Sequence, residues 1–173
     1  MKLTPELEDA FNTQITLEFQ ASMVYRQLAI EMELADLPGA AGWLRHQADE
    51  EIAHANKFID HLCDRENHPK IGVIPQPDVT HSPSVLKAFE EALAHEQKVS
   101  AAIRDLYRAS DVAGDLDSRP LLSWFLTEQL EEESTVSQIV GRVRLIKDDG
   151  PGLLRLDAEL GERPVATTEN RNS

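Results

Sequence analysis

The segment LRHQADEEIAHANKF, residues 44–58, carries the pattern that decides the fold. Glu51 lies seven residues after Leu44 and seven before Phe58, and seven residues are close to two turns of an α-helix. The glutamate therefore falls within the apolar stripe of its helix. His54 follows Glu51 by three residues on the same face, a Glu-x-x-His spacing used by carboxylate-bridged metal centres in four-helix bundles.

Three further glutamates occupy the same kind of position in other segments. Each has a large apolar residue seven positions before it and another seven positions after it; they are Glu18, Glu96 and Glu132. An ionised carboxylate in an apolar core is costly unless it is protonated, paired with a base or bound to a cation. Because the helices supply few bases, the pattern predicts a metal centre. Oxygen ligands with one imidazole favour iron or manganese, and iron is the expected metal.

Glycine and proline are concentrated at a few points, and the segments between them have helical spacing. These breaks predict four long helices near residues 4–36, 38–67, 83–114 and 118–150, and a short fifth helix at 152–160. The second helix is about 40 Å long, and the 15 residues of 68–82 can span about 50 Å. The expected fold class is therefore all-α, a four-helix bundle with one long crossover.

Length and composition predict a single domain over residues 1–162, followed by a disordered tail at 163–173. Ser82 and Pro83 suit the cap and first turn of the third helix. The net charge of −14 argues against binding to nucleic acid or to anionic membranes. No membrane span or secretory signal is visible, so we expect a cytoplasmic protein. One cysteine, Cys63, leaves no thiolate cluster for metal binding.

Other polar residues near the four glutamates have two readings each. Tyr25 lies one heptad after Glu18, where its hydroxyl can reach a carboxylate or supply an electron, but a purely structural aromatic fits equally well. Trp124 is close enough in sequence to approach the site, but core filling is the favoured explanation for it. Three more acids either form a solvated face or hold a second, weaker cation beside the first; they are Glu50, Glu128 and Glu131.

Four segments resemble the ligand-bearing segments of the non-haem bacterial ferritins: LEF at 17–19, DEEIAH at 49–54, HEQ at 95–97 and WFLTEQLEE at 124–132. The resemblance covers nearly the whole chain and implies the ferritin-like fold. It implies that one iron is held by Glu18, Glu51 and His54. It implies that a second is held by Glu51, Glu96 and Glu132, with Glu51 bridging the pair and Gln129 beside it. An additional iron site would be formed by Glu50, Glu128, Glu131 and Glu132.

The activity implied by the resemblance is that of a ferroxidase. Such a protein oxidises Fe(II) to Fe(III) with O2 or H2O2 and stores it as a ferric mineral inside a shell of twenty-four identical subunits. Its catalytic residues would be the five ligands Glu18, Glu51, His54, Glu96 and Glu132, together with Tyr25. The acidity of the chain is compatible with a cavity wall that attracts cations.

Two related families differ from this sequence at informative positions. Bacterioferritins and rubrerythrins repeat Glu-x-x-His in the fourth helix, whereas this chain has Gln129 three residues before Glu132. Bacterioferritins place their haem-ligating methionine directly after the glutamate of the second helix, and this chain has Ile52 there. No haem is therefore expected.

Two rival interpretations remain from the sequence. One is a di-iron or di-manganese oxidase that acts on another substrate without storing mineral, which would need a substrate pocket beside the metals. The other is a metal-free helical interaction protein whose acids form salt bridges. It predicts that replacing Glu51 leaves the metal content unchanged.

Overall fold

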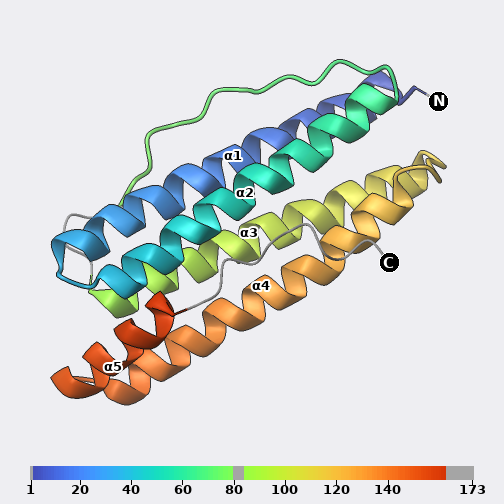
Figure 1. The fold of residues 1–173 in the computed structure, drawn as a ribbon. Helices are drawn as coiled ribbons and strands as arrows, with labels where there is room; N and C mark the ends of the chain where they lie inside the picture. The colour runs from blue at the N-terminus through green and yellow to red at the C-terminus, as the bar shows by residue number, and fades with distance from the viewer. Residues whose placement is uncertain (1, 80–83, 163–173) are drawn as a thin grey trace.

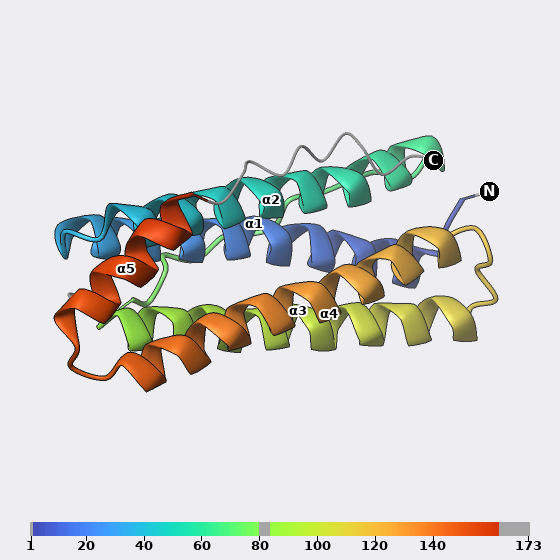
Figure 2. The ribbon, with the colours of Figure 1, turned by 60° about the horizontal axis from the view of Figure 1, so that its bottom comes forward.

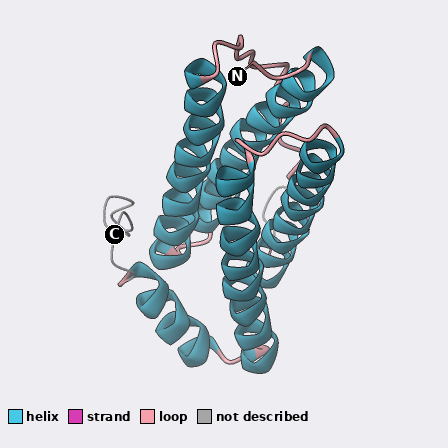
Figure 3. Ribbon diagram, turned by 90° about the vertical axis from the view of Figure 1, so that its right-hand side faces the viewer, coloured by secondary structure: helices cyan, strands magenta, loops and turns pink. Residues whose placement is uncertain are grey.

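The computed structural model describes residues 2–79 and 84–162, in which the chain forms five helices and no strand. The helices are α1 (Pro5–Leu34), α2 (Pro38–Asp64), α3 (Val85–Val112), α4 (Arg119–Ile146) and α5 (Gly150–Gly161). Helices α1 to α4 form the predicted bundle, and α5 lies across one of its ends (Figures 1 and 2). Since α1–α2 and α3–α4 are joined by short turns, each pair is antiparallel (Figure 3). The all-α prediction with a short fifth helix is confirmed.

Helix boundaries follow local chemistry. Thr4 caps α1, accepting a hydrogen bond from the amide of Leu7, and Pro5 opens the first turn as expected. Ser84 caps α3 through the amide of Lys87 at 3.2 Å. The helix thus begins at Val85 and not at the expected Ser82–Pro83 pair, which lies outside the described residues, as does the predicted disordered tail.

The end of α4 differs from the prediction. The helix ends at Ile146 instead of continuing to Gly150 and Pro151, because Lys147 adopts a left-handed conformation with a φ of 51°. Gly150 and Pro151 open α5 instead, since proline in a first helical turn loses no hydrogen bond. The same two residues thus start the next element two residues earlier than predicted.

The crossover after α2 runs back along the bundle and is fastened to α1 (Figure 1). The amide of Lys70 donates to the side-chain oxygen of Asn12 at 2.7 Å, and the amide of Gly72 donates to the hydroxyl of Thr16 at 2.8 Å. The crossover is extended and belongs to no helix or sheet, so these side chains provide the hydrogen-bond partners for its backbone amides.

The end of α2 is tied to the turn between α3 and α4. Arg65 is buried and donates to the carboxylate of Asp115 and to the hydroxyl of Ser118, both at 2.8 Å. The guanidinium lowers the pKa of Asp115 even though partial burial opposes that shift. This buried pair fixes the two hairpins to each other at that end of the bundle.

At the other end, α5 supplies a cap for α2. Leu37 precedes α2 and offers no side-chain acceptor, so the first amides of the helix need another partner. The buried carboxylate of Asp157 accepts from Gly39 at 3.2 Å and from Ala40 at 2.7 Å. Gly39 has to be glycine, because a Cβ atom there would lie 1.8 Å from the carbonyl oxygen of Asp157. Leu156 and Leu160 pack beside this contact.

The apolar core consists of two clusters with a polar layer between them. One cluster includes Trp43, Phe89 and Leu156, and the other includes Phe58 and Phe125, whose rings stack with centroids 4.1 Å apart. Every glutamate of the heptad pattern has one flanking apolar residue in each cluster. The four carboxylates thus lie midway along the bundle. Among the described helices, none is both long enough and apolar enough to cross a membrane.

Candidate metal centre

The four glutamates predicted to converge are all buried, one on each helix of the bundle. Glu18 and Glu96 are fully buried, Glu51 is 1% exposed and Glu132 is 6% exposed. His54 is 4% exposed and lies one turn after Glu51 on α2. All four acids therefore lie in the core, as the heptad pattern predicts.

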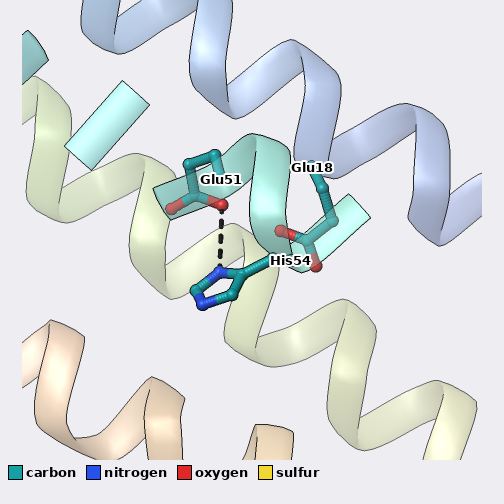
Figure 4. Close-up of side chains that lie close together, drawn as sticks. All are labelled: Glu18, Glu51 and His54. Carbon is teal, nitrogen blue, oxygen red and sulfur yellow. Dashed lines mark ion pairs between the residues drawn. The ribbon is translucent and has the colours of Figure 1, made fainter. Parts of the chain in front are cut away.

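Three of these residues form a compact group with the geometry of a metal site. Glu18, Glu51 and His54 each offer a ligand atom, and these atoms lie within 4.8 Å of one another (Figure 4). The Nδ1 atom of His54 is 3.5 Å from an Oε atom of Glu51. Both carboxylate oxygens of Glu51, one oxygen of Glu18 and Nδ1 of His54 have no hydrogen-bond partner among the described residues. Buried polar atoms are normally satisfied, so this group is poised to bind a cation.

The other two acids are held by neighbours and are not part of this compact group. Glu96 accepts hydrogen bonds from the hydroxyl of Tyr25 and from Nε2 of Gln129, the latter at 3.1 Å. Glu132 accepts from Nε2 of Gln47 at 2.9 Å. Each carboxylate is thus oriented by an amide from another helix. Gln129 lies beside Glu96, next to the position expected for a second metal.

Two glutamines near the acids were not identified from the sequence. Gln14 lies four residues before Glu18 and donates to it at 2.7 Å, while Gln47 lies four residues before Glu51 and reaches across to Glu132. Both side chains are buried. The available signal was their place in the apolar stripe, one helical turn before an acid. Such an amide fixes one oxygen of a carboxylate and leaves the other for a metal.

Burial and mutual repulsion raise the pKa values of the acids. Burial is the main cause for Glu18 and Glu51, and a neighbouring carboxylate adds to it in each case. The pKa of Glu96 is also raised by burial. Burial and the charge of Glu96 raise the pKa of Glu132 to about 8. In the absence of metal Glu132 therefore retains its proton at neutral pH, and a bound cation has to displace it.

The hydroxyl of Tyr25 does reach a carboxylate, since this fully buried side chain donates to Glu96. Burial and the charge of Glu96 raise its pKa, which keeps the phenol protonated. Trp124 is half-buried, and its ring lies 5.7 Å from that of His54. The ring of Trp124 also contacts Phe125, and the ammonium of Lys57 lies 4.6 Å from its centroid.

The three additional acids differ in burial. Glu50 is half-buried, and Nε2 of His46 lies 3.4 Å from one of its oxygens. Glu128 is half-buried as well, and both acids contribute to the raised pKa of Glu132, whereas Glu131 is exposed. The compact ligand group includes none of the three. A second cation site at these residues stays a prediction.

Comparisons with known proteins agree over nearly the whole chain. A sequence profile described as the ferritin-like domain matches residues 8–146. The chain is 33% identical over 158 residues to a bacterial non-heme ferritin of Escherichia coli O6:H1, covering 91% of this chain and 95% of that protein. A bacterial non-heme ferritin of Staphylococcus saprophyticus is 35% identical over 170 residues, covering 96% of this chain and 99% of the relative.

A solved structure gives the same result for the fold. An open pore ferritin from the hyperthermophilic archaeon Archaeoglobus fulgidus superposes with a TM-score of 0.91 at 32% sequence identity, over 95% of this chain and 100% of that one. Sequence and fold thus agree, and the protein belongs to the ferritin family.

Proposed function

We propose that this protein oxidises Fe(II) at the buried centre and stores the ferric product inside a shell of identical subunits. The observation that carries the proposal is the convergence of four buried glutamates from four helices on one polar layer, with carboxylate and imidazole atoms left without hydrogen-bond partners. A metal-free interaction protein would gain nothing from burying four acids in this way, because burying carboxylates without a cation is costly.

The donor set fits two ferrous ions. One position would be held by Glu18, Glu51 and His54, which already form a compact group. The second would be held by Glu51, Glu96 and Glu132, with the neutral Gln129 beside it. Carboxylates gain more from a ferric than from a ferrous ion because the charge is higher, so these ligands favour oxidation. With one charge fewer than an additional glutamate would give, Gln129 should leave the second position the weaker one.

Electrons and protons balance without a further cofactor. Two ferrous ions supply two electrons; O2 takes them up with two protons to leave as hydrogen peroxide, and H2O2 takes them up with two protons to leave as two waters. Displacement of the proton from the carboxyl group of Glu132 on iron binding provides a nearby source of one of these protons. Tyr25 holds Glu96 in place throughout.

Storage in a shell of twenty-four subunits rests on the likeness to proteins named as ferritins. The net charge of −14 supports it, since an acidic wall attracts ferrous ions and their oxidation products. The test is aerobic addition of Fe(II) to the metal-free protein, followed by size separation with iron and protein measured in the same fractions. Hundreds of irons that comigrate with a large shell would establish storage.

Two other outcomes would contradict the proposal. About two irons per chain, without more, would indicate a catalytic di-iron protein that stores no mineral, and no bound iron would exclude the metal centre. Glu51→Gln keeps the shape of the side chain but removes the bridging charge, and we expect it to abolish rapid oxidation. Glu133→Gln is the matched control, because Glu133 is half-buried beside Glu132 but pairs with Arg104 at the surface.

A further inference from the structure

We propose that His46 and Glu50 of α2 form a separate site for a zinc ion, and that zinc bound there slows the loading of the second iron position. The effect on iron rests on the proposed function, whereas the binding of zinc does not. The site differs from the additional iron site that the likeness to non-haem bacterial ferritins implies, because that site consists of carboxylates alone and does not include His46.

His46 and Glu50 face each other one helical turn apart, at the separation of two ligands of one ion. Nε2 of His46 lies 3.4 Å from Oε1 of Glu50, and the residues are four positions apart on α2. In a tetrahedral zinc site the bonds to an imidazole nitrogen and a carboxylate oxygen are about 2.1 Å long, which places these two atoms about 3.4 Å apart. The pair can therefore hold zinc with little rearrangement.

Polar atoms of both side chains lack other partners. Nε2 of His46 and Oε2 of Glu50 are buried and have no hydrogen-bond partner among the described residues. Buried polar atoms are normally paired with protein groups or with water. A cation bound between the two side chains would satisfy the imidazole nitrogen and neutralise the carboxylate.

The pair lies close enough to solvent to exchange an ion. The side chain of His46 is 19% exposed and that of Glu50 is 13% exposed, whereas Glu51 in the buried centre is 1% exposed. Trp43, one turn before His46 on α2, lines an open groove of about 510 Å³ against α4 and α5. Within the part of the chain that the structure describes, no third acid, histidine or cysteine joins the pair in a compact ligand group. Water would complete the coordination, so zinc should bind reversibly.

The donor set and its geometry favour zinc among the divalent cations. Calcium and magnesium prefer oxygen ligands, whereas imidazole suits zinc, copper, iron and nickel. Of these four, zinc is the ion that most often takes a tetrahedral site with nitrogen and oxygen ligands in proteins. Zinc has no redox chemistry, so it would stay in place under conditions that oxidise iron.

A cation beside Glu50 acts on the buried centre through its charge. Burial and Glu96 are the main causes of the raised pKa values of Glu51 and Glu132, and the charge of Glu50 adds to both shifts. The charge of Glu50 thus reaches two proposed ligands of the second iron. Bound zinc would turn this negative charge into a net positive one, which opposes the entry of ferrous iron. Coupling between two binding sites typically changes affinity about 5- to 150-fold, so we expect a weakening of at least about fivefold.

His95 shows why an unpartnered imidazole is not sufficient. Its Nε2 atom is also buried without a hydrogen-bond partner among the described residues. Burial and the charge of Lys98 lower the pKa of His95 to about 4. The ammonium group that lowers this pKa also repels a metal ion, whereas Glu50 attracts one to His46. No zinc is therefore expected at His95.

The site is tested by soaking crystals of the metal-free protein in Zn(II) and recording anomalous diffraction on both sides of the zinc edge. We expect a peak between Nε2 of His46 and the carboxylate of Glu50, besides zinc in the buried centre. His46→Gln and Glu50→Gln should each lose this peak and keep those of the centre. His68→Gln is the matched control, because it removes an exposed imidazole and should leave the peak unchanged. Absence of the peak from the wild type, or its persistence in His46→Gln, would overturn the site.

The effect on iron is tested by following the oxidation of Fe(II) by O2 at increasing Zn(II). Zinc competes directly at the centre in every variant, and His46→Gln removes only the contribution of the separate site. Half-inhibition of His46→Gln should need at least about fivefold more zinc than that of the wild type or of His68→Gln. A normal rate without zinc shows that His46→Gln is folded.

The two proposals fail in different ways. Identical inhibition curves for the wild type and His46→Gln would overturn the coupling between zinc and iron and leave the proposed function intact. A wild type that oxidises no iron in the absence of zinc would overturn the proposed function and the coupling with it, while the zinc peak at His46 and Glu50 would still establish the binding site.

Discussion

Gln47 donates a hydrogen bond to one oxygen of Glu132, a proposed ligand of the second iron. It does so from α2, across the polar layer, through a hydrogen bond of 2.9 Å. Amide partners of this kind orient a ligand without binding the metal, and their loss typically lowers metal affinity about 10- to 100-fold. The effect on the two iron positions should therefore differ.

We expect Gln47→Met to weaken the second iron position while the first keeps its affinity, because Glu132, a proposed ligand of the second iron, loses its orienting amide. Anaerobic titration with Fe(II) or Co(II) would then show an unchanged first site and a second site weaker than in the wild type. Gln97→Met is the control, since Gln97 is exposed on α3 next to Glu96. Equal weakening of both sites would show that Gln47 acts on the whole centre.

The raised pKa of Glu132 makes the stability of the metal-free protein depend on pH. Its pKa is about 8 in the folded chain and 4.5 in the reference state, so between these values the folded chain retains a proton that the unfolded chain has lost. The stabilising contribution of this proton is complete below about pH 4.5 and is lost as the pH rises through about 8. Glu132→Gln cannot lose a proton. We therefore expect the melting temperature of the wild type to fall relative to this variant between pH 5 and pH 9, as measured by calorimetry on metal-free samples.

Iron binding should displace the proton that Glu132 retains in the metal-free protein. More protons should be released per bound ion at pH 6.5 than at pH 9, because fewer carboxyl groups remain protonated at the higher pH. If the wild type and Glu132→Gln respond identically to pH, Glu132 does not carry this titration.

The sequence was sufficient to predict the four buried acids, but not the glutamines that donate hydrogen bonds to acids. A glutamate between two large apolar residues contradicts the usual pattern of a buried stripe, so Glu18, Glu51, Glu96 and Glu132 stand out one by one. Gln14 and Gln47 do not, because glutamine is common on the surface of any helix and its cost of burial is smaller. Their role depends on distances between helices, which one sequence does not contain.

At the scale of the elements, helix starts were easier to predict than helix ends. Thr4 and Pro5 have one favourable place in a helix, and the structure uses them there. The end of α4 depends on the left-handed conformation of Lys147, and a lysine in the sequence does not predict that conformation. Proline and glycine mark a break but leave open which side of it is helical, so Gly150 and Pro151 could be read as an end or as a start.

The contact between Asp157 and the start of α2 should control how firmly α5 is held. Asp157→Ala removes the acceptor for the amides of Gly39 and Ala40, which is the loss of a helix cap and costs about 1 kcal/mol. For a chain of this length that lowers the melting temperature by about 2–4 °C. We also expect faster hydrogen exchange in α5, measured by mass spectrometry.

Asp148→Ala is the control for this contact, because Asp148 is exposed in the turn before α5. Oxidation of iron should persist in both variants, as α5 contributes no residue to the polar layer. Unchanged exchange in Asp157→Ala would show that Leu156 and Leu160 hold α5 without the cap.

At the scale of the whole molecule, the charge of −14 should speed the arrival of iron. Attraction between an acidic protein and a cation weakens as salt screens it, and the Debye length falls from about 30 Å at 0.01 M to about 3 Å at 1 M. We expect the rate of Fe(II) uptake, followed by stopped-flow absorbance, to fall steeply over this range of sodium chloride. Once Fe(II) is bound, oxidation after a pulse of O2 should depend little on salt. A rate of Fe(II) uptake that does not change with salt would show that long-range electrostatic attraction does not contribute to it.

The polar layer between two apolar clusters also bears on how such a chain evolves. Selection for stability alone would fill the centre of the bundle with leucine and methionine, since buried acids without a cation are destabilising. Under the proposed function, substitutions of Glu18, Glu51, Glu96 or Glu132 that make the fold more stable would remove ligands of the iron centre. The two clusters carry the stability that the centre gives up, so a mutation that weakens either of them reduces the margin on which the activity depends.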